Sequence, residues 1–502
     1  MVSSMSPTYD AVIVGAGPNG LAAAIELARA GLSALVLEAE AQPGGGCRSQ
    51  ASTLPGFVHD PCSTVHPLGK SSRFFRALAL ERYGLRWVEP SACVAHLLGD
   101  GQPVMMERSL TATANGLGGD GAAYRELFEP FVENFDRLME MILGPLRWPS
   151  DPALYARFGL SALPSLARLA RQRFRGEAAP ALLAGVAAHA MLPLDRIATA
   201  SFALVLGASA HAVGWPIAAG GSQAITDALV ACLRDLGGEL RLNEPILQRA
   251  QLPPARAYLF DVTPRQLLAI YGEAMPERYA RRLRRFRYGP GVFKIDWALD
   301  APIPWRDPRC SRAGTVHLSG SLARVSEAEA AVHGGGIAGH PFTLLVQPSL
   351  FDPSRAPPPS HTAWAYCHVP HGSSWDVTGA IESHVERFAP GFRRLIRARA
   401  TKNASQMERF NANYVGGDIN GGLADFGQLL FRPVVRLDPY ATALDNVFLC
   451  SSSTPPGGGV HGMCGYWAAR SALRKVFAKA PASELDAPRV MRVSGEQRTA
   501  AE

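Results

Sequence analysis

The chain has 502 residues, of which 47% are hydrophobic and 19% charged, and its formal net charge is +7. This length allows two or three domains that could bury a large ligand, and no apolar run is long enough to cross a membrane. The basic residues are spread out without a nucleic-acid-binding module, and the eight cysteines form no CxxC pair, so we expect neither a nucleic-acid partner nor a bound metal.

The N-terminal segment predicts a βαβ unit. An apolar strand pattern over 9–15 is followed by glycines, by a helical pattern over 21–30 and by a second strand pattern over 34–38. In such a unit the glycine turn lies at the helix N-terminus, where unpaired N–H groups bind phosphate. A carboxylate at the end of the second strand can accept hydrogen bonds from a ribose. The residues that we expect to hold a dinucleotide here are Gly15, Gly17, Pro18, Asn19, Gly20 and Glu38.

The middle of the chain predicts a helical insertion and then a return to the first sheet. Residues 110–215 show helical periodicity with few strand signals. A helical pattern over 223–236 and a short strand pattern over 257–260 follow, which is typical of a second crossover into a parallel sheet.

A second sheet is expected further along the chain. Its strand patterns alternate with proline-rich loops and cover 292–299, 342–347 and 362–369. This arrangement predicts an antiparallel sheet that walls a substrate cavity.

The C-terminal part distinguishes FAD from NAD. A strand pattern over 446–450 leads through Gly457-Gly458-Gly459 into a helix over 462–477. This second helix N-terminus would present backbone amides to an acceptor that becomes anionic, as N1 and O2 of a reduced flavin do. NAD needs no such cradle. The residues expected here, together with the glycine turn that follows Glu38, are Gly45, Gly46, Arg48, Ser453, Val460, His461, Gly462 and Met463.

Motifs along nearly the whole chain carry a family resemblance. They include Gly44 to Arg48, Gly56 to Asp60, Gly220 to Gln223, Gly289 to Leu299 and Pro455 to Tyr466. With Gly15 to Gly20, they resemble the phytoene-dehydrogenase-related flavoproteins, a carotenoid-desaturase-like family. The resemblance implies an α/β fold with a Rossmann-like FAD-binding domain of discontinuous segments, a substrate domain with a mixed or antiparallel sheet, and a helical insertion.

The expected domains follow from these patterns. We assign residues 1–75, 216–270 and 430–480 to the FAD-binding domain, and residues 76–110 and 271–429 to the substrate domain. The helical insertion covers 111–215, and 481–502 is expected to be a flexible tail.

The expected activity is an FAD-dependent desaturase or dehydrogenase reaction, in which hydride leaves a C–H bond of a hydrophobic substrate for flavin N5. Two alternatives stay open, namely a redox-neutral polyene isomerase with transiently reduced FAD and a flavin-bearing interaction protein. An amine oxidase ranks lower because no lysine can be assigned to the flavin. We expect non-covalent FAD, since none of Cys450, Cys464 and His461 stands out as a tether.

The catalytic candidates are His461 beside the flavin cradle and the polar group of His59, Asp60 and His66. For each of them a structural hydrogen-bonding role is the competing interpretation. A helical segment with apolar residues from Leu163 to Phe174 and flanking arginines is typical either of a helix packed on a core or of a peripheral contact with an anionic membrane. We expect a cytoplasmic protein, and the sequence leaves its oligomeric state open.

Overall fold

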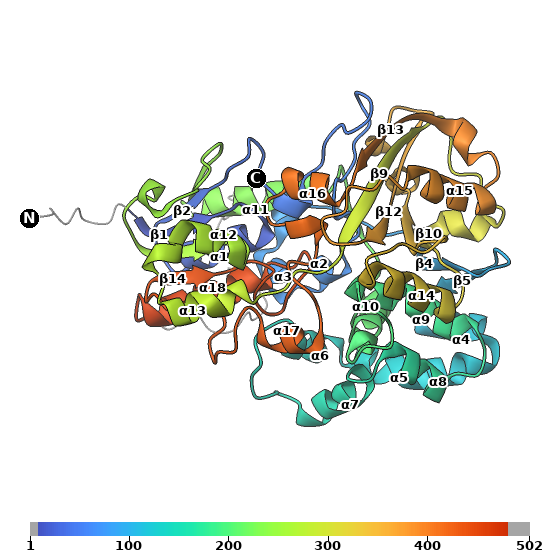
Figure 1. Ribbon diagram of the computed structural model, residues 1–502, viewed down its shortest axis with the longest axis horizontal. Coiled ribbons are helices and arrows are strands. Elements are labelled where there is room, and N and C mark those ends of the chain that lie inside the picture. Colours follow the sequence, from blue (N-terminus) through green and yellow to red (C-terminus); the bar gives the residue numbers. More distant parts are fainter. Residues whose placement is uncertain (1–8, 480–502) are drawn as a thin grey trace, which may run out of the picture.

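The structure is a computed structural model, and it describes residues 9–479. The expected tail at 481–502 lies outside these residues. Figure 1 shows one sheet with its helices at the N-terminal end of the molecule, a second sheet at the opposite end, and a group of helices beside the second sheet. The fold class predicted from the sequence is confirmed.

The first sheet is parallel throughout, with the strand order β14-β8-β1-β2-β7. Its strands are β1 (Tyr9–Val14), β2 (Ala34–Leu37), β7 (Glu239–Arg241), β8 (Ala255–Phe260) and β14 (Val447–Leu449). The interior strands β1 and β2 are covered on both faces and are therefore apolar at most positions. Segments far apart in sequence thus build one sheet, as the discontinuous patterns predicted.

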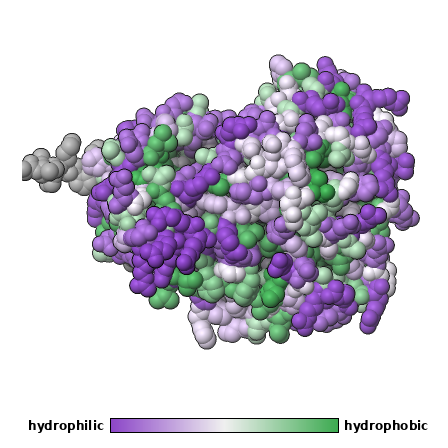
Figure 2. Space-filling model, in the orientation of Figure 1, coloured by the Kyte–Doolittle hydropathy of each residue, from purple (hydrophilic) through white to green (hydrophobic). Residues whose placement is uncertain are grey.

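Helices cover both faces of this sheet. On one face α1 (Pro18–Arg29) packs between α11 (Gln223–Asp235) and α18 (Met463–Lys475). On the other face α12 (Pro264–Tyr271) and α13 (Glu277–Arg284) contact the side chains of β8 and β14 that point away from α1. Figure 2 shows hydrophilic residues gathered over α13.

The second sheet has seven strands in the order β13-β9-β12-β11-β10-β4-β5. Its neighbours are antiparallel except for β10 and β4, which are parallel, so the sheet is mixed rather than purely antiparallel. Its strands are β4 (Ala92–Leu97), β5 (Pro103–Met106), β9 (Gly291–Leu299), β10 (Ala313–Leu318), β11 (Thr343–Val346), β12 (His361–Val369) and β13 (Ile396–Lys402). One face packs on α15 (Thr378–Phe388), and the other faces the helical region and α14 (Leu322–His333).

The helical region agrees with the expected insertion. Its helices are α4 (Leu110–Gly116), α5 (Gly121–Glu133), α6 (Phe135–Ile142), α7 (Pro152–Ala162), α8 (Leu166–Arg173), α9 (Ala178–Ala187) and α10 (Thr199–Val213). α9 is buried along almost its whole length, because it lies between the second sheet, α14 and α10. Among residues 9–479, none of the helices combines the length and apolarity needed to cross a membrane.

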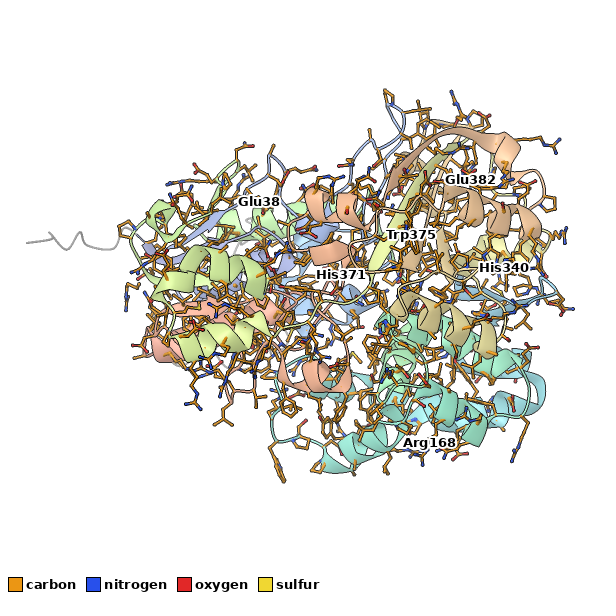
Figure 3. The ribbon with its side chains drawn as sticks, viewed as in Figure 1. Glu38, Arg168, His340, His371, Trp375 and Glu382 are labelled. Carbon is orange, nitrogen blue, oxygen red and sulfur yellow. The ribbon has the colours of Figure 1, made fainter. Side chains whose placement is uncertain are left out.

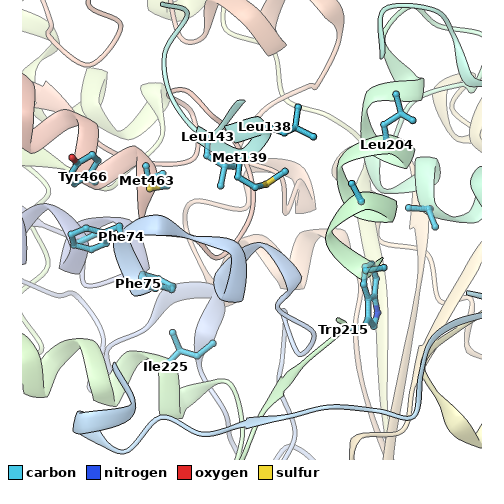
Figure 4. Close-up of a cluster of buried hydrophobic side chains, with 14 of the residues drawn as sticks. Phe74, Phe75, Leu138, Met139, Leu143, Leu204, Trp215, Ile225, Met463 and Tyr466 are labelled. Atoms are coloured by element: carbon cyan, nitrogen blue, oxygen red, sulfur yellow. The ribbon is translucent and has the colours of Figure 1, made fainter. Parts of the chain in front are cut away.

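Short elements connect the two ends of the molecule. They are α2 (Pro67–Ser71), α3 (Arg73–Leu78), α16 (Ala404–Phe410), α17 (Phe426–Phe431) and the strand pair β3 (Trp87–Val88) and β6 (Ile217–Ala218). Figure 4 shows part of an apolar cluster to which α3 contributes, with Phe74 of α3 near Tyr466 of α18 and Leu143 beyond α6. The ring centroids of Phe74 and Tyr466 are 5.5 Å apart. One continuous core therefore holds the first sheet against the helical region.

Candidate cofactor and substrate site

A cavity of about 510 Å³ runs between the two ends of the molecule. Its walls come from the first glycine turn, residues 45–47 and 62–69, the loop after α6, the second sheet and residues 451–461. The volume is in the range of cofactor and small-molecule sites. The cavity therefore brings together the two expected cradles, which are more than 400 residues apart in the chain.

The first glycine turn has the geometry of a phosphate-binding loop. Gly15 has φ of +101°, which favours glycine, and a Cβ on Gly20 would collide with the carbonyl oxygen of Gly15. Gly17 is the N-cap of α1, and Gly17, Pro18 and Asn19 form the cavity edge at this point. Pro18 has no N–H and the Gly20 N–H donates to Asp261, so the N–H groups of Gly17 and Asn19 are the candidate donors to a phosphate. Gly15 and Gly20 shape the turn beneath that edge.

Asp261 is a part of this site that sequence reasoning missed. It follows β8 and lines the cavity, its Oδ2 accepts from the Gly20 N–H at 2.9 Å, and a Cβ on Gly17 would lie 2.6 Å from the same oxygen. Burial, together with the nearby Glu38 carboxylate, raises the pKa of Asp261 to about 7, although the Gly20 N–H opposes the shift. A polar residue at the carboxyl end of a parallel strand is the signal that could have found it.

Glu38 lies at the end of β2, as expected, and is 9% exposed. Its Oε2 accepts from the Ala16 N–H at 2.6 Å and its Oε1 from the Glu40 N–H at 3.1 Å. The carboxylate therefore stiffens the glycine turn in addition to any contact with a ribose. Figure 3 places Glu38 in the end of the molecule that holds the first sheet.

The second glycine turn lies against the first. A Cβ on Gly45 would be 3.5 Å from Gly17 Cα, and both Gly45 and Gly46 line the cavity. Arg48 does not line the cavity. Its guanidinium donates to the carbonyl oxygens of Gly45 at 3.2 Å and Phe410 at 2.8 Å and stacks on the Phe410 ring. Arg48 thus holds the turn in place from behind.

The C-terminal cradle begins at Gly462, the N-cap of α18, where φ is +68°. Val460 and His461 line the cavity, whereas Gly462 and Met463 lie behind them. The Met463 N–H donates to His461 Nδ1 at 3.0 Å, so this amide is already engaged and the candidate donors to a flavin are the earlier ones. Burial lowers the pKa of His461 to about 4, so the ring is neutral and structures the turn.

Two further residues complete this end of the cavity. Ser453 lines it and donates its hydroxyl to the Gly421 carbonyl at 2.8 Å. Arg432, which was not among the expected residues, also lines it, is 1% exposed and donates to the Ser452 carbonyl at 2.9 Å. A buried guanidinium is a cationic group beside the position where a flavin would gain negative charge.

His59, Asp60 and His66 do not share one environment. His66 lines the cavity and its Nε2 pairs with the Ser222 hydroxyl at 2.9 Å. Asp60 is not among the lining residues and forms a buried ion pair with Arg355. Burial alone would raise the pKa of Asp60, but the Arg355 guanidinium and the hydrogen bonds from Ser49 and Ser222 hold it below its usual range.

His59 also lies behind the cavity wall, paired with the Thr53 hydroxyl at 2.8 Å, and burial lowers its pKa to about 4. Its neighbour Asp296 forms an ion pair with Lys294, a fully enclosed lysine that lies 4.8 Å from the Trp364 ring. This lysine, which the sequence did not single out, does not line the cavity but lies behind Trp364, which does.

The far wall of the cavity is apolar and aromatic. Trp364 and Tyr366 of β12 line it with nearly parallel rings 5.9 Å apart. Trp297 instead packs edge-on against Phe392 in the core behind β9. The structure separates Trp364 from Trp297 because successive side chains of a strand point to opposite faces of the sheet, and Trp297 is paired with Ala363.

The loop around residue 415 has a divided role as well. Asn411, Asn413 and Tyr414 line the cavity. Asp418 is 1% exposed and accepts from the N–H groups of Gly289 and Gly422, so it locks the loop.

Comparison with known proteins agrees with this geometry. The family model for the NAD(P)-binding Rossmann-like domain matches residues 13–79. Pyridine nucleotide-disulfide oxidoreductase domain-containing protein 2 of Rattus norvegicus is 26% identical, with 94% of each chain covered. Phytoene desaturase (lycopene-forming) of a Paracoccus species is 25% identical and covers 91% of this chain and 95% of its own. The chain is a homologue of these oxidoreductases.

Solved structures also resemble this chain in fold. A triple mutant of putrescine oxidase superposes with a TM-score of 0.60 at 16% identity, over 94% of this chain and 99% of that one. The oxidoreductase thus shares one architecture with an amine oxidase and is related in sequence to a desaturase.

Proposed function

We propose that the chain is an FAD-dependent oxidoreductase that takes hydride from a C–H bond of a hydrophobic substrate. The observation that carries the proposal is a single cavity with a phosphate-binding turn at one end, a second helix N-terminus beside it and an aromatic wall beyond. A dinucleotide with a flavin ring needs both helix ends, and an apolar substrate needs the wall.

The residues fit FAD at each part of its length. Gly17, Pro18 and Asn19 would bind the pyrophosphate and Glu38 the ribose of the adenosine half. Asn19 Oδ1 is buried and has no protein partner within residues 9–479, so it remains available to a ligand. Val460 and His461 would hold the pyrimidine side of the ring. When bound, FAD supplies the acceptor of the hydride.

Attachment is expected to be non-covalent. Neither Cys450 nor Cys464 lines the cavity, and burial raises the pKa of Cys464 to about 12, so its thiol stays protonated. Acid precipitation of the purified yellow protein should leave all of the flavin in the supernatant. Flavin that stays with the pellet would contradict this part of the proposal.

The chain's own residues orient the substrate and exclude water. Trp364 and Tyr366 offer flat apolar surface, and Phe158 and Phe202 close the wall from the helical region. The putrescine oxidase fold keeps amines on the list of substrates to test. The aromatic and aliphatic lining favours a hydrocarbon such as the one named in the desaturase relative.

A peripheral membrane contact would suit such a substrate. Leu146 lines the cavity and is 52% exposed. Trp148 in the loop before α7 is 89% exposed, and Leu160 on α7 is 80% exposed. Exposed large apolar side chains are typical of interfacial binding.

The deciding experiment is anaerobic mixing of the FAD-loaded protein with phytoene in detergent micelles and, separately, with putrescine. Loss of the oxidised-flavin absorption with phytoene, and formation of a more unsaturated product, is the expected result. If only putrescine bleaches the flavin, the proposed substrate class changes from a hydrocarbon to an amine. Product isomerised without net flavin reduction would favour the isomerase alternative, and no change with any substrate would favour an interaction protein.

Replacement of Gly17 by Val tests the cofactor site itself. A side chain there would collide with Asp261 and block the pyrophosphate, so the variant should purify without FAD. Gly116→Val is the matched control, because a Cβ on Gly116 meets no atom within 4 Å among the described residues, and it should retain full FAD. Full FAD content in Gly17→Val would show that the cofactor binds elsewhere.

A further inference from the structure

Four histidines form a cluster between the second sheet and the helical region. His96, His317 and His368 project from β4, β10 and β12 and are 0%, 0% and 2% exposed. His189 lies just beyond α9 and lines the cavity. The His317 ring centroid is 6.0 Å from that of His189 and 5.8 Å from that of His96. The cluster therefore reaches from the cavity wall into the core.

The polar atoms of this cluster are left unsatisfied to an unusual degree. Both ring nitrogens of His317, one nitrogen of each other histidine and one oxygen of the adjacent Glu329 have no hydrogen-bond partner within the described part of the chain. Buried polar groups are nearly always paired with protein or ordered water. Ordered water is the usual partner of such buried atoms where the protein supplies none. Among residues 9–479, no group of three or more His, Cys, Asp or Glu side chains is arranged to hold a metal ion.

A glycine makes room for the cluster. Gly185 lies within α9, where glycine is unfavourable, and a Cβ there would collide with Nδ1 of both His317 and His96. The absence of a side chain at Gly185 thus leaves space for the two histidine rings that face it.

The cluster also has an outlet. His368 Nδ1 pairs with Glu329 Oε1 at 2.7 Å, and Glu329 lies on α14. His333 is one turn further along α14, where that helix ends at the surface. His333 interacts electrostatically with both Glu329 and His368, and Arg196 is the cation beside it.

We propose that His189 accepts the proton released when the substrate is oxidised, and that His368 and Glu329 pass it through bound water to His333 and solvent. The inference rests on the proposed function. One C–H bond of the substrate gives hydride to the flavin, and the electron pair of the neighbouring C–H bond becomes the new π bond. Its proton goes to Nε2 of His189 and leaves along the cluster, so atoms and charge balance.

The position of His189 suits this role. Its backbone oxygen accepts from Asn420 Nδ2 at 3.2 Å, and Asn420 packs on Gly458 of the flavin cradle. Burial, with His368 nearby, lowers the pKa of His189 to about 4, so the ring is a neutral acceptor at neutral pH. The titratable side chains that face it are His317 from β10 and His368 from β12.

The first test needs no substrate. Histidine hydrogen exchange, followed by mass spectrometry of the FAD-loaded protein in D₂O, reports water access and protonation of each ring. We expect deuterium in His189 and His368, and about tenfold slower exchange at His368 in Glu329→Gln, because the substitution removes the carboxylate with which the His368 ring is paired. The exposed His340 should exchange equally in both proteins and serves as the control. Cluster rings that stay undeuterated, or exchange unchanged in Glu329→Gln, would overturn the proposal.

The second test follows flavin bleaching by phytoene and by putrescine. His189→Gln should slow it by about 10²–10⁴-fold, the usual contribution of a general base, with unchanged FAD content and partial rescue by added imidazole. His340→Gln should behave like the wild type. A full rate in His189→Gln refutes the role of His189 and leaves the proposed function standing. If neither probe bleaches the wild type, the proposed function fails, and the exchange experiment alone decides whether the cluster conducts protons.

Discussion

At the scale of single residues, the cofactor site depends on carboxylates at strand ends. Glu38 follows β2 and Asp261 follows β8, the two strands on either side of β1. Both carboxylates accept a hydrogen bond from the glycine turn, Glu38 from the Ala16 N–H and Asp261 from the Gly20 N–H. Two acidic groups beside a phosphate-binding turn repel each other and the ligand unless one is protonated. We therefore expect FAD binding to be coupled to the uptake of a proton.

This coupling predicts the pH dependence of FAD affinity. Since the pKa of Asp261 is raised to about 7, the side chain is neutral below that pH, and the pyrophosphate would raise its pKa further. FAD binding then takes up a proton, so affinity should be highest below about pH 7 and fall by up to tenfold per pH unit above it. Fluorescence titration of FAD between pH 6 and 9 measures this. Asp261→Asn should flatten the profile, and a flat wild-type profile would disprove the coupling.

Glu38→Ala should weaken FAD binding by about 1.5–3 kcal/mol, the usual value of hydrogen bonds to a charged group. The loss has two sources, since the ribose contact disappears and the Ala16 N–H loses its acceptor. Isothermal titration of the apoprotein gives the value. Glu81→Ala, at an exposed carboxylate, is the control, and an unchanged dissociation constant in Glu38→Ala would place the ribose elsewhere.

At the scale of elements, α8 shows how one pattern can arise from packing alone. Leu166 and Ala170 are 0% and 1% exposed and Phe174 is 5% exposed, so the apolar stripe packs on the core. Leu163 alone remains half-exposed. The stripe is therefore not a membrane-binding face, while Arg168 lies at the outer edge of the helical region (Figure 3).

Membrane association should instead depend on α7 and the loop before it. We expect Trp148→Ser with Leu160→Ser to reduce cosedimentation with anionic liposomes several-fold, because both are large apolar side chains exposed to solvent. Replacing Arg168, Arg171 and Arg175 by Gln should weaken binding only at low salt, through screened long-range attraction. Liposome binding that survives the first change and is abolished by the second would reverse this assignment.

At the scale of the whole molecule, the cavity joins segments from both ends of the chain, so FAD should act as a clamp. FAD at a hundred times its dissociation constant should stabilise the apoprotein by about 2.7 kcal/mol. FMN at the same concentration should raise the melting temperature less, because it lacks the adenosine half that the first glycine turn would bind. Thermal unfolding monitored by circular dichroism measures both, and equal shifts would show that the first turn contributes nothing.

The sequence by itself determined the parts of this protein that local patterns encode. Gly15, Gly17 and Gly20 between a strand and a helix require a particular backbone, and the glycines before α18 do the same, so both helix ends could be located. Three strands of the second sheet, β9, β11 and β12, followed from apolar and aromatic patterns, whereas β4, β5, β10 and β13 were not predicted. Where bounds were predicted, they agreed to within about three residues, because capping and turn residues act locally.

Only the tertiary structure decided which side chains meet. Asp261 and Arg432 reach the cavity through sheet topology and a loop from the far end of the chain, and Trp364 is separated from Trp297 by the face of the strand on which each lies. His59 and Asp60 precede residues 62–69, which line the cavity, but do not line it themselves. The four histidines come from separate elements, and no local pattern joins them. Long-range contacts arise from the packing of whole elements. The local sequence around each residue does not show which distant residue it will contact.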